Sequence, residues 1–190
     1  MHYKSYETRH VFMVLAICTL LCSPFFILLA PLGVAHTIYY DYGVRLVYVP
    51  SINYWVYGVG WFLIFLGLSL LFLLKLRKTS IVVAVICLIG SGILFYGGSK
   101  SFVTITDETI TYRGVFAKEE SNYEWIEVSK VNYYQMSQMD PETSYYEFEF
   151  KDANKLILKE NGKVSEIQGL IESSVINADG EFNTIEKEEE

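Results

Sequence analysis

A stretch near the middle of the chain, GILFYGGSKS at residues 92–101, comes closest to a phosphate-binding loop. Gly92 and Gly97 have the spacing of a P-loop, but GSKS stands where that motif requires Gly-Lys followed by Ser or Thr. The stretch also follows an apolar run of membrane-helix length, whereas a P-loop follows a strand. We therefore expect no nucleotide site and no cofactor.

Cysteine and histidine offer little for catalysis or metal binding. Cys18 and Cys22 are one helical turn apart and could be soft metal ligands or an acylation site, but we expect buried structural thiols. The three histidines, His2, His10 and His36, all precede residue 101, so the second half lacks the usual base for a Ser or Cys nucleophile. The sequence therefore predicts neither a catalytic site nor a metal site, and a protein that is not an enzyme.

Acidic residues dominate the second half of the chain. Residues 101–190 hold eight basic and twenty acidic side chains, a net charge of −12, whereas residues 1–100 hold seven basic and two acidic ones. This balance disfavours nucleic acid as a partner. The acidic pairs could bind calcium loosely, but none has EF-hand spacing, and we interpret them as solvated turns: Asp107/Glu108, Glu119/Glu120 and Asp140/Glu142.

Three uncharged apolar segments have the length of a membrane span, which takes roughly 17–25 residues. They lie at about residues 11–32, 54–74 and 81–98. Pro24 and Pro31 should kink the first span or end it early. A cleaved signal peptide is the alternative for residues 1–35, but the apolar stretch is longer than the roughly 7–15 residues of such a leader, so we expect an uncleaved span.

Positive charge near span ends predicts the orientation, because basic residues are retained in the cytoplasm. Five basic residues share the side of the N-terminus and three share the other: Lys4, Arg9, Lys75, Arg77 and Lys78 against Arg45, Lys100 and Arg113. We expect a multi-pass protein of the cell membrane with a cytoplasmic N-terminus and an extracytoplasmic C-terminal domain. The first outer loop, residues 33–53, reads as a hairpin turning at Asp41-Tyr42-Gly43, with its tyrosines in an interfacial aromatic belt.

Small residues recur every seven positions in each span, a period typical of left-handed helix crossings. We expect the three helices to pack along these seams, and a homo-oligomer could use them too. The seams are Ala16, Ser23 and Ala30, then Gly60 and Gly67, then Ala84, Ser91 and Gly98.

From Ser101 onward the apolar period changes to two, which indicates strands. We expect a hairpin around Asp107-Glu108, a strand over 125–134, a strand over 145–150, and a DANK turn leading into LILK. A helix then follows, with a capping pair of Ser165 and Gln168. Its apolar face is Val164, Ile167, Leu170, Ile171 and Val175, and we expect the acidic stretch 177–190 to be disordered.

A strand meander closed by one amphipathic helix resembles the bacterial pleckstrin-homology-like (PH-like) modules of small multi-span membrane proteins. The resemblance covers residues 102–176 and rests on ITDETITYRG, YEWIEVSKV, DANKLIL and the helix. It implies a membrane domain at 1–100, an α+β PH-like domain at 101–176, made of an antiparallel sheet and a C-terminal helix, and a tail at 177–190. That family often places the module in the cytoplasm, whereas the charge count places it outside.

The expected function is that of a membrane-anchored interaction or accessory protein whose module binds a protein partner. The partner would contact a strand edge or exposed aromatic side chains, and the candidates are Tyr133, Tyr134, Tyr145 and Tyr146. Asp152 and Glu160 interrupt the cluster of lysines at 151–163, so we expect no binding of the isolated module, residues 101–176, to anionic vesicles. The alternatives are that these tyrosines merely cover the sheet, and that the protein is a subunit of a membrane transport or channel assembly.

Overall fold

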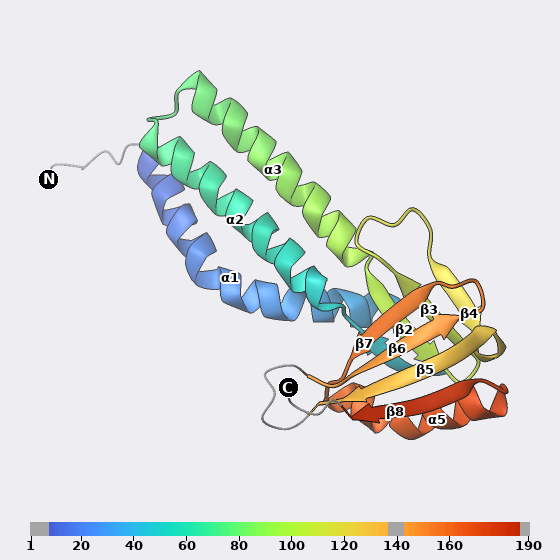
Figure 1. The fold of residues 1–190 in the computed structure, drawn as a ribbon. Helices are drawn as coiled ribbons and strands as arrows, with labels where there is room; N and C mark the ends of the chain where they lie inside the picture. Colours follow the sequence, from blue (N-terminus) through green and yellow to red (C-terminus); the bar gives the residue numbers. More distant parts are fainter. Residues whose placement is uncertain (1–7, 137–142, 187–190) are drawn as a thin grey trace, which may run out of the picture. The chain divides into compact units, whose positions relative to one another are not determined.

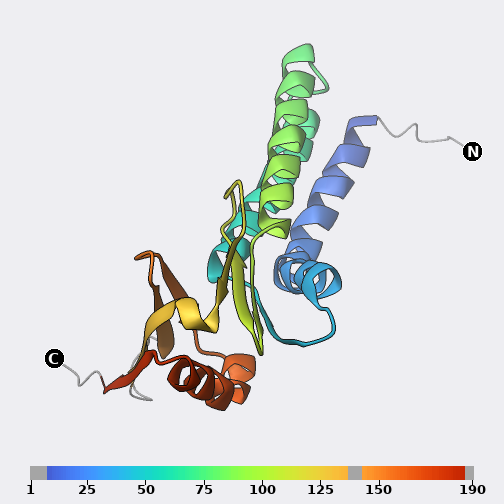
Figure 2. The ribbon, with the colours of Figure 1, turned by 90° about the vertical axis from the view of Figure 1, so that its right-hand side faces the viewer.

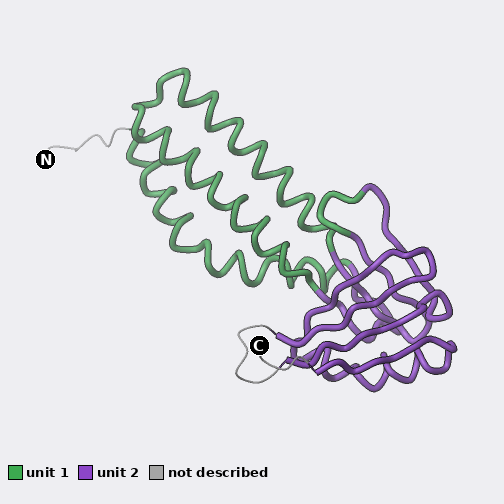
Figure 3. The backbone as a smooth tube through the Cα atoms, in the orientation of Figure 1, with its two compact units in different colours: residues 1–38, 49–101, 114–117 green, residues 39–48, 102–113, 118–190 purple. Residues whose placement is uncertain are grey.

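The chain divides into two compact units in the computed structural model, which describes residues 8–136 and 143–186. Residues 1–38, 49–101 and 114–117 form the helical unit, and residues 39–48, 102–113 and 118–190 form the sheet unit (Figure 3). The sheet unit therefore includes residues 39–48, which the sequence analysis assigned to the membrane domain.

Three helices in the described chain are long and apolar enough to cross a membrane: α1 (Thr8–Tyr39), α2 (Ser51–Leu73) and α3 (Lys78–Ser99). The expected spans are thus confirmed as helices of membrane-crossing length. Helix α1 continues through Pro24 and Pro31, so the early end did not occur, but its axis clearly changes direction (Figures 1 and 2). Proline removes one backbone hydrogen bond and crowds the preceding turn, which explains a bend in a continuous helix.

Helices α2 and α3 pack through the predicted small residues. A Cβ placed on Gly67 would lie 3.3 Å from the Cβ of Cys87, and one on Gly98 would lie 2.7 Å from the ring of Tyr57. The buried Asn53 amide adds a polar tie, because its Nδ2 donates to the carbonyl oxygens of Gly98 at 3.2 Å and Ser101 at 2.8 Å. These glycines permit the close approach of the two helices.

The first sheet has the order β1-β2-β3-β4 and is antiparallel throughout. Its strands are β1 (Val44–Tyr48), β2 (Phe102–Thr106), β3 (Thr109–Arg113) and β4 (Ser121–Glu124). The hairpin expected within residues 33–53 is wrong, since residues up to Tyr39 continue α1 and β1 pairs with β2 instead. The turn itself is present, with Gly43 at φ +92°, and it delivers Leu46 and Tyr48 into the core.

The second sheet has the order β7-β6-β5-β8. Its strands are β5 (Val128–Gln135), β6 (Tyr145–Phe150), β7 (Lys155–Lys159) and β8 (Glu181–Glu186). The strands expected at 145–150 and after the DANK turn are confirmed. The strand expected from residue 125 begins only at Val128, because Trp125–Glu127 forms a 3₁₀ turn (η1) stabilised by a capping box between Glu124 and Glu127.

The expected single helix is two shorter ones, α4 (Gly162–Glu166) and α5 (Gln168–Asn177). The capping pair is also wrong: the side chain of Asn161 accepts hydrogen bonds from the backbone N–H groups of Lys163 and Val164, and no side chain caps α5. The apolar face is confirmed, since Val164, Ile171 and Val175 are fully buried.

Strand β8 overturns the expectation of disorder for residues 181–186, while 187–190 lie outside the described residues. It pairs parallel to β5 and places Phe182 against the core, which gives this acidic segment an apolar anchor. The sheet unit therefore differs from a single antiparallel sheet closed by one C-terminal helix. It has two four-stranded sheets, and the inner faces of both contribute to one core with α4 and α5 (Figure 2).

Candidate interaction face of the second sheet

Two of the four candidate tyrosines lie in the core. Tyr133 and Tyr146 stack across β5 and β6 with ring centroids 4.5 Å apart, and their side chains are 8% and 0% exposed. The expectation that these two are exposed is therefore wrong, because the alternation of the strands turns both inward. Burial raises the pKa of both, and the Tyr133 hydroxyl donates to Glu160 at 2.8 Å.

The other two tyrosines form a second stack on the opposite surface of the same sheet. Tyr134 and Tyr145 face each other across β5 and β6 with centroids 4.7 Å apart, and both are half-buried. The register extends this pair into a row across all four strands, with Lys159 beside Tyr145 and Ile185 beside Tyr134. The row presents aromatic and aliphatic surface at one end of the sheet.

Two further rows complete what we call the outer face, the surface formed by the outward residues of β5 to β8. The middle row holds Ile157, Glu147, Asn132 and Asn183, and the last row holds Lys155, Glu149, Lys130 and Glu181. Figure 1 views this sheet with β7, β6, β5 and β8 in front. Helices α4 and α5 contribute to the core on its other side.

The charged groups of the outer face neutralise one another. Lys155 Nζ lies 3.1 Å from Glu147 and 3.9 Å from Glu149, and Lys130 Nζ lies 4.0 Å from Glu181. The hydrogen bond from Lys155 lowers the pKa of Glu147 and raises that of Lys155. This end of the face therefore offers paired charges, whereas Tyr134, Tyr145 and the exposed side chain of Ile157 supply the area that a partner could bury.

Sequence reasoning missed the two isoleucines of this face. Ile157 lies between Leu156 and Leu158, and the period of two would have placed it opposite those buried neighbours. Ile185 lies in the acidic segment that was expected to be disordered. Its assignment depends on the pairing of β8 with β5, which is a long-range contact.

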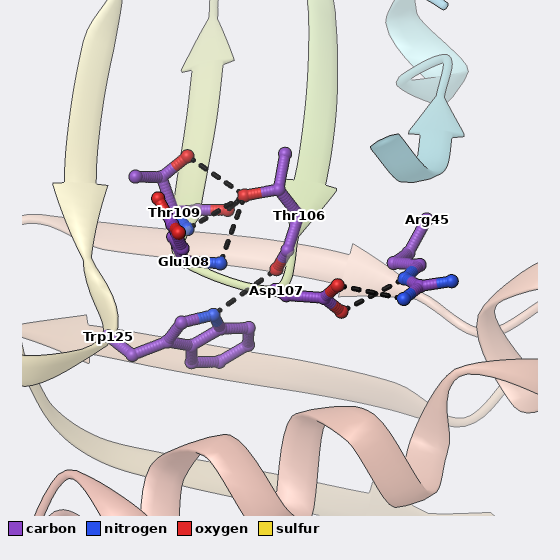
Figure 4. Close-up of polar contacts among 6 residues, drawn as sticks. All are labelled: Arg45, Thr106, Asp107, Glu108, Thr109 and Trp125. Atoms are coloured by element: carbon purple, nitrogen blue, oxygen red, sulfur yellow. Dashed lines mark hydrogen bonds and ion pairs between the residues drawn. The ribbon is translucent and has the colours of Figure 1, made fainter. Parts of the chain in front are cut away.

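The turn between β2 and β3 binds other parts of its own unit (Figure 4). Arg45 donates to both carboxylate oxygens of Asp107, at 2.9 and 2.8 Å, and this contact lowers the pKa of Asp107. Thr106 Oγ1 accepts the backbone N–H groups of Glu108 and Thr109, and the Trp125 indole donates to the Thr106 carbonyl oxygen at 3.3 Å. The Asp107 carboxylate thus joins this turn to β1, whereas Glu108 takes part through its backbone N–H. Asp140 and Glu142 lie outside the described residues.

A second polar cluster joins the two sheets. The Tyr123 hydroxyl donates to Asp152 at 2.7 Å and accepts from the Asn154 amide at 2.8 Å. Burial, together with the Asp152 contact, raises the pKa of Tyr123 to about 12. The Tyr123 ring stacks on Phe150 with centroids 3.9 Å apart, so this cluster also fixes the fold.

The remaining sequence candidates lie in the helical unit. Residues 92–99 belong to helix α3 rather than to a loop. Cys18 and Cys22 are exposed on α1, contrary to the expected burial, and Cys87 is buried. No group of three or more His, Cys, Asp or Glu side chains that could hold a metal ion occurs in residues 8–136 and 143–186.

No known protein family model matches the chain, and no curated protein is significantly similar to it in sequence.

Proposed function

We propose that the protein is a membrane-anchored interaction protein without enzymatic activity, whose sheet unit has a PH-like fold and binds a protein partner through the outer face. The observation that carries this proposal is the row of Tyr134, Tyr145 and Ile185 on a sheet surface that the helices of the same unit leave open. Aromatic side chains are enriched in protein interfaces because they bury a large area at a low entropic cost.

The charge of the outer face favours a protein over a lipid surface. Its lysines at 130 and 155 already lie beside carboxylates, and residues 101–190 carry a net charge of −12. Attraction to an anionic bilayer requires several basic groups acting together, each contributing about 1 kcal/mol. A fragment of residues 101–176 would lack both β1 and β8, so binding experiments require the full chain.

We further propose that the sheet unit is extracytoplasmic and the N-terminus cytoplasmic, as the basic residues at the span ends favour. Because β1 pairs with β2, both strands must lie on the same side of the membrane, so the chain between residues 48 and 102 crosses it an even number of times. Helices α2 and α3 supply two such crossings. Topology reporters fused after Lys78 and after Lys187 test the orientation. We expect a cytoplasmic signal from the first and an extracytoplasmic signal from the second; a cytoplasmic signal after Lys187 would overturn it.

Affinity capture of the full chain from solubilised membranes tests the function. We expect one specific partner with the unmodified chain, its loss in Tyr134→Ala/Tyr145→Ala, and its retention in Ile176→Ala, which truncates an exposed side chain on α5. A partner retained by the double tyrosine variant, or no specific partner in any membrane extract, would contradict the proposal. The alternative of a transport or channel subunit rests on the three long helices and their small residues, but no charged side chain in the described spans 11–32, 54–74 and 81–98 marks an ion path.

A further inference from the structure

A cavity opens at one end of the helical unit, between the first turn of α1 and the connection from α2 to α3. It has a volume of about 400 Å³ and is lined by Thr8, Arg9, Lys75 and Leu76. Figure 1 shows the start of α1 and this connection at the same end of the unit. Ligand sites in proteins have volumes of roughly 300–1,000 Å³, so the cavity can accept a small polar group.

The cavity lies in a basic environment. Lys75 lines it, Arg77 follows in the same connection, and Lys78 begins α3. The described residues of the helical unit contain no aspartate or glutamate, and within them no ion pair involves Lys75, Arg77 or Lys78. The positive charge of the connection therefore favours an anion that the described residues 8–38, 49–101 and 114–117 do not supply.

The backbone of the connection holds Lys75 in place. Lys75 and Leu76 adopt left-handed conformations, with φ of 51° and 56°, which are unfavourable for residues other than glycine. The N–H groups of both residues donate to carbonyl oxygens of α2, at 3.3 Å to Phe72 and 3.1 Å to Leu71. Leu73 and Leu74, just before the connection, have exposed side chains, so apolar surface adjoins the basic cavity.

We propose that this cavity binds the phosphate-bearing headgroup of an anionic phospholipid. Ends of membrane-crossing helices lie at headgroup depth, and basic pockets between such helices are suited to anionic headgroups. Lys75 contacts the phosphate, and the exposed leucines contact the glycerol and the start of the acyl chains. A phosphatidylcholine headgroup binds less well because its own positive charge balances its phosphate. This site is independent of the partner proposed for the outer face.

Native mass spectrometry of the full chain in detergent, titrated with phosphatidylglycerol or phosphatidylcholine, tests the proposal. We expect preferential retention of phosphatidylglycerol and about fivefold weaker binding in Lys75→Asn, since one basic group contributes about a factor of five. Asparagine adopts the left-handed conformation more readily than most residues, so this variant preserves the turn. Lys75→Arg keeps the positive charge and should therefore bind phosphatidylglycerol like the unmodified chain.

Lys100→Asn is the matched control, because it removes the same charge from the other end of α3, where Lys100 lies 4.3 Å from the ring of Tyr96. Equal retention of the two lipids, or equal weakening in Lys75→Asn and Lys100→Asn, would overturn the proposal. Competition with inorganic phosphate distinguishes a lipid headgroup from a soluble phosphate as the bound anion. Displacement of phosphatidylglycerol by millimolar phosphate would assign the cavity to a soluble phosphate instead, whereas retention supports the lipid.

Discussion

Two tyrosine pairs on opposite faces of one sheet show how position, rather than residue type, separates a core from a candidate surface. Tyr133 with Tyr146 and Tyr134 with Tyr145 each stack across β5 and β6, at centroid distances of 4.5 and 4.7 Å. The first pair is buried in the core and the second is half-buried on the outer face. The stacking geometry is nearly the same, so the surroundings of each pair determine what its removal should do.

The largest effect on stability is expected from the inner pair. Tyr146→Ala would leave a cavity in a closely packed core, and we expect a loss of about 3–5 kcal/mol in the free energy of unfolding. Hydrogen exchange of the β5 and β6 amides in the detergent-solubilised chain measures this loss locally. Tyr146→Phe is the control: the hydroxyl has no hydrogen-bond partner among the described residues, so its removal should be neutral or slightly stabilising.

The outer pair should show the reverse pattern. Tyr134→Ala/Tyr145→Ala should weaken partner binding by about 2 kcal/mol, roughly 30-fold, as expected for central aromatic residues of an interface. The loss of stability should stay near the 0.5–1.5 kcal/mol of an aromatic pair. Titration of the captured partner and hydrogen exchange of the same variant measure the two quantities. A variant that unfolds like Tyr146→Ala would show that the two faces do not differ as described.

Alkaline pH should affect the buried tyrosines. Burial raises the pKa values of Tyr133 and Tyr146, and that of Tyr123 reaches about 12. A raised pKa means that the fold favours the neutral phenol, so this stabilisation is complete below pH 10, the usual pKa, and is lost as pH rises through 12. We expect unfolding and tyrosinate absorbance to increase together over this range. Tyr123→Phe should move the onset to higher pH, and an unchanged onset would contradict this assignment.

The smallest effect is expected at the charged end of the outer face. The hydrogen bond from Lys155 lowers the pKa of Glu147, so its contribution is present above the usual pKa of 4.5 and is lost as pH falls through the lowered value. Lys155→Gln removes the charge and the cause of the lowered pKa of Glu147, so the stability above pH 4.5 should fall slightly and the acid-side loss of stability should become smaller. Lys159→Gln is the matched control on the same strand. Identical acid limbs for the two variants would contradict a specific contact with Glu147.

Local patterns predicted much of this structure. Uncharged runs identified the three long helices, and the period of two identified β2, β3, β6 and β7. The same period, applied to each tyrosine separately, would have placed Tyr133 and Tyr146 inside. Treating the four tyrosines as one cluster hides the difference between the two pairs.

The sequence-based predictions are wrong where pairing between distant segments determines whether a strand forms. Strand β1 pairs with residues more than fifty positions away, and β8 depends on the free edge of β5, so neither shows a complete local signal. The outer face needs β8 for its full row, because Ile185 comes from that strand. The cavity at Lys75 likewise depends on the meeting of α1 with a connection far along the chain.

Site-specific photo-crosslinking in native membranes tests the interaction face most directly. A photoreactive amino acid would replace Tyr145 or Ile157 on the outer face, or Glu172 on α5, in the full chain. We predict one discrete crosslinked product with another protein from positions 145 and 157, and none from 172. The absence of a product at 145 and 157, or the same product from position 172, would contradict the assignment of the outer face as the partner-binding surface.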